Sequence, residues 1–524
     1  MARILVVESV AQPAIDLLVA AHETDVRLDL PREQLLSLAG GYDALVVRSQ
    51  TRIDDDLLAA APRLSVVGVA SVGTDRIDLA AATRAGVMVV NAPTGNTIAA
   101  AEHTIALMLA LLRKIPSADA SVRRGEWDRA GHTGAELRNK TIGIIGLGKI
   151  GKAVARRIAA FEARILASDP YLTAEQAAEA SAKLVGLPEL LGRSDVISVH
   201  TPLTAQTRGM IGQAQIDAMK PGSYLLNVSR GGIVDEAVLS RALEEGRLAG
   251  AALDVYSAEP MDADSPLRSA PNTVLTPHLG ASTTEAQDRV GIEMAEQVLL
   301  ALSGITPPYA VNAPAIALEV APKLRPYVEL ARRLAILARQ LSPAPYPSIA
   351  LVYAGEIAAW DCSPVRTAAL AGILEPVTDQ RVNAVNADLI ARERGLTVNE
   401  TKTDAADPWS SLVRVSLGDL RLAGSTAHGR PHLAGLDDFQ LDAELAGIIL
   451  VTRHQDRPGI VGAVGTILAD ARINISSLEL SRLSAAGEAR MFVSVDDSIP
   501  DTALERVAAV DGMLDARVVE LPPL

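Results

Sequence analysis

The chain has 524 residues, which is too long for a single hydrophobic core and predicts about three or four domains. Hydrophobic residues make up 49% and charged residues 21%, which excludes a largely disordered chain; aromatic residues, at 3%, are too few for a stacking platform for single-stranded nucleic acid. The net charge of −14 argues against a general polyanion partner, but leaves room for a local cationic pocket that binds a small anion.

The single cysteine, Cys362, excludes an internal disulfide and a multi-cysteine metal site, and we expect no metal. The longest apolar run in a helical setting, Ile105–Leu112, is far shorter than the ~18 residues typical of a membrane span. The N-terminal run Arg3–Glu8 has the pattern of a strand and lacks the layout of a signal peptide. We therefore expect a cytoplasmic protein with neither a membrane nor a nucleic-acid partner.

Short β-branched runs alternate with alanine-rich helical stretches through roughly the first 300 residues, a pattern typical of parallel β-α-β units. The predicted strands fall into two series: Ile4–Val7, Ala44–Arg48, Ser65–Val69 and Met88–Asn91, then Thr141–Ile145, Arg164–Ser168, Val196–His200, Tyr224–Val228, Ala251–Val255 and Thr273–Thr276. Two series predict two doubly wound α/β domains, the second inserted in a flavodoxin-like first one.

Two long predicted helices, Thr97–Arg113 and Thr284–Leu302, lie where the chain leaves the first series and where it returns. We therefore expect a discontinuous first domain of residues 1–98 and 285–310, and a Rossmann domain of residues 99–284. After Pro307-Pro308 the pattern changes, and residues 311–443 are predicted to form an α+β intervening domain. Residues 444–524 have the β-α-β-β-α-β order of a ferredoxin-like unit.

A glycine-rich turn follows the strand Thr141–Ile145 and opens a helix, which is the setting that a dinucleotide site requires. Gly146 permits the tight turn, Gly148 allows close approach of the pyrophosphate, and Gly151 allows close helix–strand packing. The helix N-terminus offers unpaired N–H groups to the phosphates. Asp169, at the end of the next strand, can accept hydrogen bonds from the ribose hydroxyls and would repel a 2′-phosphate. The motif therefore predicts NAD as the cofactor.

Arg230, Glu259 and His278 each follow the carboxyl end of a different predicted strand, where ligands bind in a doubly wound sheet. Reduction of a ketone by hydride needs a proton donor with a pKa near neutrality, and histidine suits this best. Glu259 could orient the His278 imidazole, and Arg230 could bind a substrate carboxylate and polarise the adjacent carbonyl. The histidines His103 and His200 are interpreted as structural or supporting residues.

Three segments resemble the signature blocks of the D-isomer-specific 2-hydroxyacid dehydrogenases: Asn227–Glu236, Ala252–Pro260 and Thr276–Ser282. The resemblance covers essentially the whole chain, and implies that Arg230 binds substrate while His278 and Glu259 form the acid/base pair. It implies oxidation of 3-phosphoglycerate to 3-phosphohydroxypyruvate, the entry step of serine synthesis, by a homo-oligomer. The further cofactor positions that it implies are Lys149, Ile150, Thr201, Pro202, Ser229, Asp254 and His278 itself.

The resemblance also implies substrate contacts at Asn96 and Ser71-Val72-Gly73, with Arg48 near the phosphate. Val69 stands where many relatives have an arginine, so recognition of a phosphate would depend on Arg48. Two alternatives therefore stay open. One is a dehydrogenase of another D-2-hydroxyacid, of the glyoxylate or hydroxypyruvate type, and the other is a non-catalytic NAD-binding regulatory protein.

The last domain resembles the amino-acid-binding ACT module, which implies L-serine as an effector. Gly459 and Ile460, at a helix start, could hold a carboxylate, and Asp456 is available for an ammonium group. Asn474 could bond either end of the ligand, and His454 completes the expected set. The alternative is that this domain serves only in oligomerisation. The acidic segment Leu436–Asp442 makes the intervening domain a poor place for an anion site.

Overall fold

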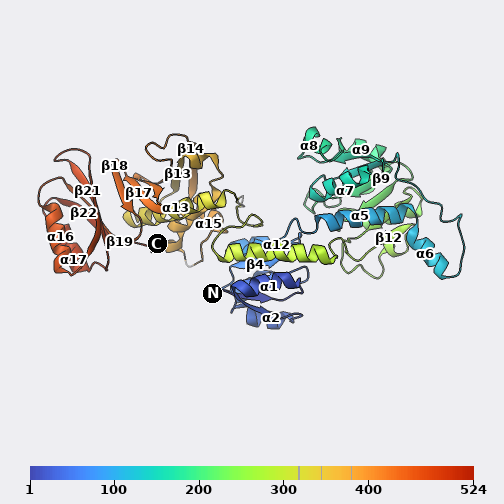
Figure 1. Ribbon diagram of the computed structural model, residues 1–524, viewed down its shortest axis with the longest axis horizontal. Coiled ribbons are helices and arrows are strands. Elements are labelled where there is room, and N and C mark those ends of the chain that lie inside the picture. Colours follow the sequence, from blue (N-terminus) through green and yellow to red (C-terminus); the bar gives the residue numbers. More distant parts are fainter. Residues whose placement is uncertain (315, 317–318, 344, 379, 524) are drawn as a thin grey trace. The chain divides into compact units, whose positions relative to one another are not determined.

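The computed structural model describes residues 1–314, 316, 319–343, 345–378 and 380–523. It divides into two compact units (Figure 1). The first unit comprises residues 1–9, 15–91 and 294–524, and the second comprises residues 10–14 and 92–293. Within the described residues, no helix is both long enough and apolar enough to cross a membrane.

The first unit begins with a five-stranded parallel sheet in the order β2-β1-β3-β4-β5. Its strands are β1 (Arg3–Val6), β2 (Glu23–Val26), β3 (Ala44–Val47), β4 (Val66–Val69) and β5 (Met88–Val90). Helices α2 (Arg32–Ala39), α3 (Asp55–Ala60) and α4 (Leu79–Arg84) pack on one face, and α1 (Gln12–Ala21) follows β1. This confirms the flavodoxin-like order.

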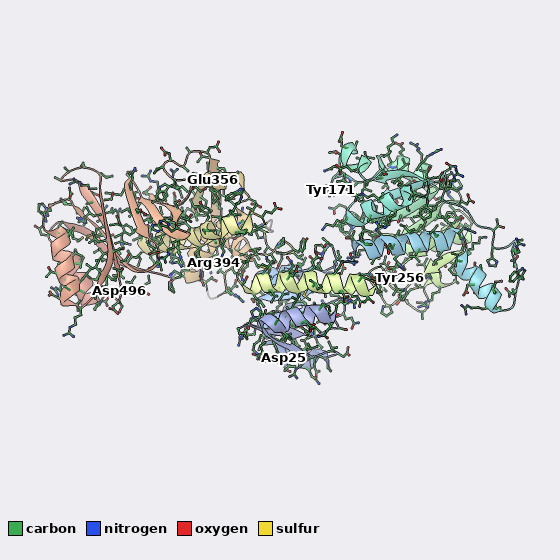
Figure 2. The ribbon with its side chains drawn as sticks, viewed as in Figure 1. Asp25, Tyr171, Tyr256, Glu356, Arg394 and Asp496 are labelled. Carbon is green, nitrogen blue, oxygen red and sulfur yellow. The ribbon has the colours of Figure 1, made fainter. Side chains whose placement is uncertain are left out.

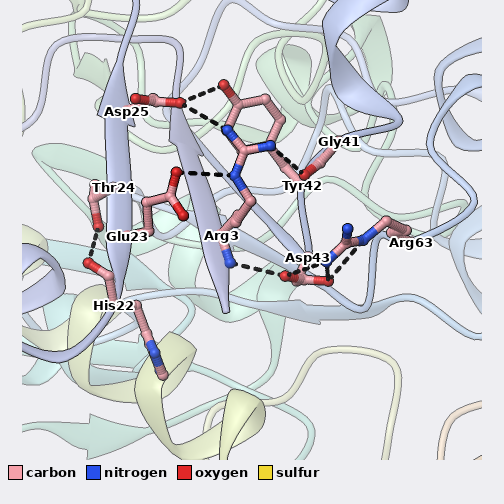
Figure 3. Close-up of polar contacts among 9 residues, drawn as sticks. All are labelled: Arg3, His22, Glu23, Thr24, Asp25, Gly41, Tyr42, Asp43 and Arg63. Carbon is pink, nitrogen blue, oxygen red and sulfur yellow. Dashed lines mark hydrogen bonds and ion pairs between the residues drawn. The ribbon is translucent and has the colours of Figure 1, made fainter. Parts of the chain in front are cut away.

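Strand β2 was not predicted, because its four residues are polar apart from Val26 and none is fully buried. Side chains at the amino ends of the strands hold it in place (Figure 3). Arg3 of β1 bonds Glu23 of β2 at 3.1 Å, and the Tyr42 hydroxyl donates to Asp25 at 2.6 Å. β2 has no apolar signal in the sequence because neither of its faces is buried in the core.

The second unit contains a seven-stranded parallel sheet in the order β12-β11-β10-β9-β6-β7-β8. Its strands are β6 (Thr141–Ile145), β7 (Arg164–Ser168), β8 (Lys183–Leu184), β9 (Val196–Val199), β10 (Tyr224–Asn227), β11 (Gly250–Leu253) and β12 (Thr273–Leu275). Strand order reverses between β6 and β9, which is the switch point where ligands bind in such sheets. The doubly wound fold predicted for this segment is confirmed.

Helices cover both faces of this sheet. One face packs against α5 (Thr97–Leu112) and α7 (Lys149–Ala159), and the other against α9 (Leu187–Arg193), α10 (Gln213–Ala218) and α11 (Glu236–Glu244). The remaining elements are α6 (Ile115–Arg123), α8 (Ala174–Ala178), the 3-10 turn η1 (Pro266–Arg268) and α12 (Thr284–Leu302).

Residues 319–445 form a six-stranded sheet in the order β14-β13-β15-β16-β17-β18, antiparallel except for the β13–β14 pair. Its strands are β13 (Ser348–Gly355), β14 (Thr397–Thr403), β15 (Ser411–Leu417), β16 (Leu420–Ala427), β17 (Arg430–Leu436) and β18 (Phe439–Glu444). The helices are α13 (Ala321–Leu341), α14 (Ser363–Leu374) and α15 (Ala387–Glu393), with 3-10 turns η2 (Glu356–Ala359) and η3 (Glu375–Val377).

The C-terminal segment forms a four-stranded antiparallel sheet in the order β20-β21-β19-β22. Its elements are β19 (Gly447–Gln455), α16 (Ile460–Asp470), β20 (Ile475–Arg482), β21 (Glu488–Val495), α17 (Asp501–Ala508) and β22 (Met513–Leu521), as predicted for a ferredoxin-like unit. One face packs under α16 and α17. The other face places Val451, Phe492 and Val519 in the same apolar core as α13 and β13.

Arg333 of α13 joins these two segments although its side chain is only 3% exposed. The guanidinium donates to the carbonyl of Leu445 at 2.7 Å, and to those of Pro522 and Pro523 at 2.6 and 2.8 Å. It also pairs with Glu329 at 2.6 Å. A buried arginine is thus neutralised by one carboxylate and satisfied by three backbone carbonyls.

Candidate active site

The turn between β6 and α7 has the geometry that the glycine pattern predicted. Gly146 has a φ of +87°, and a Cβ there would lie 2.6 Å from the carbonyl oxygen of His200. A Cβ on Gly151 would lie 2.2 Å from the Gly146 carbonyl oxygen, so α7 approaches the turn closely. Gly148, the N-cap of α7, faces open space and has no side-chain cap. The helix start is therefore open to a phosphate, with Lys149 and Ile150 as its first residues.

The Asp169 carboxylate is held in place beside this turn. One oxygen accepts the Leu147 N–H at 2.9 Å, and the other accepts the Tyr171 N–H at 3.0 Å. A carboxylate has about four acceptor positions, so capacity remains for two ribose hydroxyls. Tyr171, labelled in Figure 2, follows two residues later and is exposed. Nearby in the fold, after β9, the Thr201 hydroxyl is buried without a partner in the described structure. The open helix start, the Asp169 carboxylate and the Thr201 hydroxyl together fit a dinucleotide.

Two of the other predicted cofactor positions, Pro202 and Ser229, lie in the loops after β9 and β10. The Ser229 hydroxyl donates to Asn227 at 2.8 Å. Asp254 follows β11, and its carboxylate accepts hydrogen bonds from Thr276, Leu279 and Gly280. The cofactor roles of Pro202, Ser229 and Asp254 stay predictions.

The His278 and Glu259 side chains meet as predicted. The Nδ1–H of His278 donates to a Glu259 oxygen at 2.7 Å, while the imidazole is 48% exposed. The hydrogen bond with Glu259 raises the pKa of His278 above its ordinary value of 6.5, against the effect of burial. Because Nδ1 faces the carboxylate, Nε2 is left to exchange a proton with a substrate.

Glu259 is itself positioned by Tyr256, which the sequence did not single out. The Tyr256 N–H donates to the second Glu259 oxygen at 3.0 Å, and the Tyr256 hydroxyl donates to the Thr276 carbonyl at 2.9 Å. Burial would raise the pKa of Glu259, but hydrogen bonds from His278 and Tyr256 hold that pKa below its ordinary value. Only the position of Tyr256, three residues before Glu259, could have indicated this role.

Arg230 lies in the loop after β10. Its guanidinium donates to the Ser229 carbonyl at 2.7 Å, and its own carbonyl accepts the Asn227 amide at 2.8 Å. The positive charge of Arg230 lowers the pKa of His278, against the larger effect of Glu259, which raises it. An arginine fork beside a protonatable imidazole can bind a carboxylate and stabilise a developing alkoxide.

The predicted substrate residues are divided between the two units. Arg48 and residues 71–73 belong to the first, whereas Asn96 and Arg230 belong to the second. The Ser71 hydroxyl donates to the Gly73 carbonyl at 2.6 Å, and the Val72 carbonyl accepts the Asn91 amide at 2.7 Å. The Asn96 amide oxygen is buried without a partner in the described structure. A buried acceptor of this kind is costly unless a ligand satisfies it.

Arg48 lines a cavity of about 640 Å³ at the carboxyl ends of β1 and β3, together with Arg32 and Arg52. Glu8, on the cavity wall, accepts N–H groups of Ser49 at 2.9 Å and of Thr51 at 2.7 Å. Burial would raise the pKa of Glu8, but these hydrogen bonds lower it. Glu8 fixes the loop that carries Arg48, a role that the sequence interpretation missed.

The predicted effector residues are only partly available. Gly459, with a φ of +98°, precedes Ile460 at an uncapped helix start, as expected for a carboxylate site. Oδ2 of Asp456 accepts a hydrogen bond from Arg482 at 2.8 Å, so this carboxylate is already paired with one cation, and its contact with an ammonium group stays a prediction. Asn474 likewise bonds Asp496, at 2.6 Å. The His454 ring is buried and bonds Thr452, and burial lowers its pKa.

We expect Glu259→Gln to shift the pH dependence of turnover to lower pH. The hydrogen bond with Glu259 is the main cause of the raised pKa of His278, so its loss lets that pKa fall. Ketone reduction requires protonated His278 and declines as pH rises through its pKa, so the decline moves to lower pH. Initial rates in both directions between pH 5 and 10 measure this. An unmoved profile would contradict the pairing.

Three segments of the chain match known sequence families. Residues 105–280 match the NAD binding domain of the D-isomer specific 2-hydroxyacid dehydrogenases. Residues 323–427 match the D-3-phosphoglycerate dehydrogenase intervening domain, and residues 448–512 match the ACT domain.

Full-length relatives and a solved structure agree with these matches. D-3-phosphoglycerate dehydrogenase of Archaeoglobus fulgidus is 40% identical over 99% of this chain and 100% of its own length. The Synechocystis enzyme of the same name is 39% identical over 99% of this chain and 95% of its own length. The NAD-dependent formate dehydrogenase of Staphylococcus aureus, solved with NAD, is 29% identical with a TM-score of 0.53, covering 59% of this chain and 97% of that one.

These matches confirm the resemblance seen in the sequence, and they make the second sheet an NAD-binding Rossmann domain. The conclusion is that this chain belongs to the D-3-phosphoglycerate dehydrogenase family of D-isomer-specific 2-hydroxyacid dehydrogenases.

Proposed function

We propose that this chain oxidises 3-phospho-D-glycerate to 3-phosphohydroxypyruvate with NAD, the first step of L-serine biosynthesis, in the cytoplasm. The carrying observation is the His278–Glu259 pair at 2.7 Å, in a chain similar over its whole length to enzymes of that name. We also propose four domains: residues 1–98 with 285–310, 99–284, 311–443 and 444–524.

In this proposal the bound NAD supplies the hydride acceptor, and the protein residues handle the proton and the charge. Nε2 of His278 takes the proton of the substrate hydroxyl during oxidation and returns it during reduction. Glu259 keeps Nδ1 protonated and stabilises the imidazolium that forms. Arg230 binds the substrate carboxylate and balances negative charge on the reacting oxygen, and Arg48 binds the phosphate.

Oxidation of NADH with 3-phosphohydroxypyruvate, glyoxylate and hydroxypyruvate tests the substrate. We expect the phosphorylated ketoacid to give the highest kcat/KM. Preference for glyoxylate or hydroxypyruvate would instead assign the chain to another D-2-hydroxyacid, the alternative that Val69 keeps open. Tight binding of NADH without turnover of any ketoacid would favour a non-catalytic NAD-binding protein.

We expect Arg48→Ala to raise KM for 3-phosphohydroxypyruvate by about tenfold to a hundredfold, the loss of one charge-assisted hydrogen bond, with little change in kcat. Turnover of unphosphorylated hydroxypyruvate should change much less. Arg52→Ala is the matched control, because Arg52 lines the same cavity but already pairs with Asp54 at 3.4 Å. Equal KM increases for both substrates would remove Arg48 from the phosphate site.

We propose further that the C-terminal module binds L-serine between paired copies in a homo-oligomer. Support comes from the open start of α16, and from edge strand β20, whose Leu478 and Leu480 side chains are exposed. Arg482 already neutralises the Asp456 charge, which weakens its attraction for an ammonium group, so we expect weak binding. Serine titration of activity, melting temperature and mass in solution tests this. No serine effect in a stable oligomer would leave oligomerisation as the module's only role.

A further inference from the structure

A second histidine–carboxylate couple lies in the Rossmann domain and is not part of the proton transfer described above. It joins His103 of α5 to Asp254, which follows β11, with 3.2 Å between Nε2 and Oδ1. Asp254 is only 1% exposed and His103 is 19% exposed, unlike the half-exposed His278. A buried carboxylate persists only where donors compensate it, so the donors show what it holds together.

Asp254 faces donors from two parts of the chain, helix α5 and the segment after β12. Oδ1 faces Nε2 of His103 and accepts the Thr276 hydroxyl at 2.6 Å and the Leu279 N–H at 2.7 Å. Oδ2 accepts the Gly280 N–H at 2.8 Å. Burial would raise the pKa of Asp254, but the hydrogen bonds, that of His103 first among them, lower it and keep the carboxylate ionised.

The position of the proton on His103 follows from these contacts. The Thr276 hydroxyl gives its proton to Asp254, so its oxygen can only accept from Nε2 of His103, which lies 3.2 Å away. Oδ1 of Asp254 also lies 3.2 Å from Nε2 of His103, and an ionised carboxylate oxygen can only accept a hydrogen bond. Nε2 therefore carries hydrogen, whether the imidazole is neutral or charged.

The backbone that Asp254 holds is the segment that carries His278. Leu279 and Gly280 are the next two residues, and Thr276 lies two residues before. His278 itself has a φ of +57°, a left-handed conformation that costs about 1 kcal/mol or more for a residue with a side chain. A strained residue of this kind keeps its conformation only where its neighbours are fixed, and Asp254 fixes them on both sides.

We propose that His103 is a positioning residue: through Asp254 it fixes the Thr276–Gly280 segment, and thereby the direction of the His278 imidazole. The inference rests on the proposed function in one respect, that His278 is the group that transfers the proton. His103 needs no contact with substrate or cofactor. Oδ2 of Asp254 accepts a single hydrogen bond within the described residues, so it keeps an acceptor position for a ligand.

Three substitutions of His103 distinguish two possible roles of its side chain, donation of a hydrogen bond from Nε2 and simple filling of space. His103→Gln can place an amide N–H where Nε2 lies, His103→Asn is too short to do so, and His103→Leu has no donor. We expect kcat with 3-phosphohydroxypyruvate to fall about tenfold to a hundredfold in the Leu and Asn variants, as for a displaced catalytic group, with a smaller change in KM. The Gln variant should regain most of the activity.

Hydrogen exchange of the cofactor-free protein provides a second readout that needs no turnover. The Leu279 and Gly280 amides should exchange faster in the Leu and Asn variants than in the parent or the Gln variant. His432→Leu is the matched control, because His432 pairs with Asp442 at 2.9 Å in the intervening domain. It should leave kcat and the exchange of residues 276–282 unchanged. If His103→Leu does not fold, Thr276→Val removes another donor to the same oxygen and should produce the same changes.

Equal losses in the Leu, Asn and Gln variants would show that His103 acts by its shape, and would overturn the proposal. Parent-like kcat and parent-like exchange in His103→Leu would overturn it as well. A parent enzyme that turns over no ketoacid would refute the proposed function instead, and the exchange experiment would still decide whether His103 holds the segment.

Discussion

Replacement of His278 by glutamine should lower kcat by about a hundredfold to ten-thousandfold, the usual range for the loss of a general acid–base group. Glutamine has nearly the same volume as histidine, but it cannot exchange a proton near neutral pH. The loss should therefore appear in kcat, while binding of NADH, followed by fluorescence quenching, stays close to that of the parent.

The remaining activity of His278→Gln should also lose the limb of its pH profile that His278 causes. His432→Gln is a suitable control, since it removes a histidine with its own carboxylate partner outside the Rossmann domain. A His278→Gln enzyme with kcat within a factor of about ten of the parent would show that another group transfers the proton.

Replacement of Arg333 by methionine should lower the free energy of unfolding by about 3 kcal/mol, because it leaves buried carbonyl groups without donors. The Leu445 carbonyl is the most costly of these, since Leu445 is fully buried and water cannot replace the guanidinium there. Urea unfolding followed by tryptophan fluorescence measures the change, because Trp360 and Trp409 both lie in the intervening segment.

The neighbouring Arg332→Met variant is the control for that experiment. Arg332 pairs with Glu375 at 2.8 Å, but both side chains are well exposed, and such pairs contribute about 0–1 kcal/mol. Equal destabilisation by the two substitutions would mean that the contacts of Arg333 with the C-terminal tail add nothing.

Much of the fold follows from the sequence because central parallel strands are buried on both faces. Strands such as β3, with all four residues buried, therefore appear as unbroken apolar runs. Strands β2 and β8 escape detection because they are short, contain charged residues and have no fully buried side chain, unlike the apolar edge strand β5. The sequence also predicted that Arg230, Glu259 and His278 lie at one edge of the sheet, because each follows a parallel strand and parallel strands end at the same edge.

The partners of those residues were less predictable. Glu259 and His278 could be paired from their places after neighbouring strands β11 and β12. His103 precedes Asp254 by about 150 residues, and its place beside the carboxylate depends on how α5 packs on the sheet. Arg482 and Asp456 meet because β20 and β19 flank the same strand, β21, a register that no local pattern encodes.

The C-terminal sheet contributes one face to its own helices and the other to the core of the preceding segment. Loss of either module would therefore expose apolar surface of the other, so the two should melt together as one cooperative unit. A small molecule that binds only the folded C-terminal module would then stabilise α13 and β13 by mass action, although it touches neither. Binding of that molecule at the start of α16 would thereby raise the melting temperature of α13 and β13, which lie more than a hundred residues earlier in the sequence.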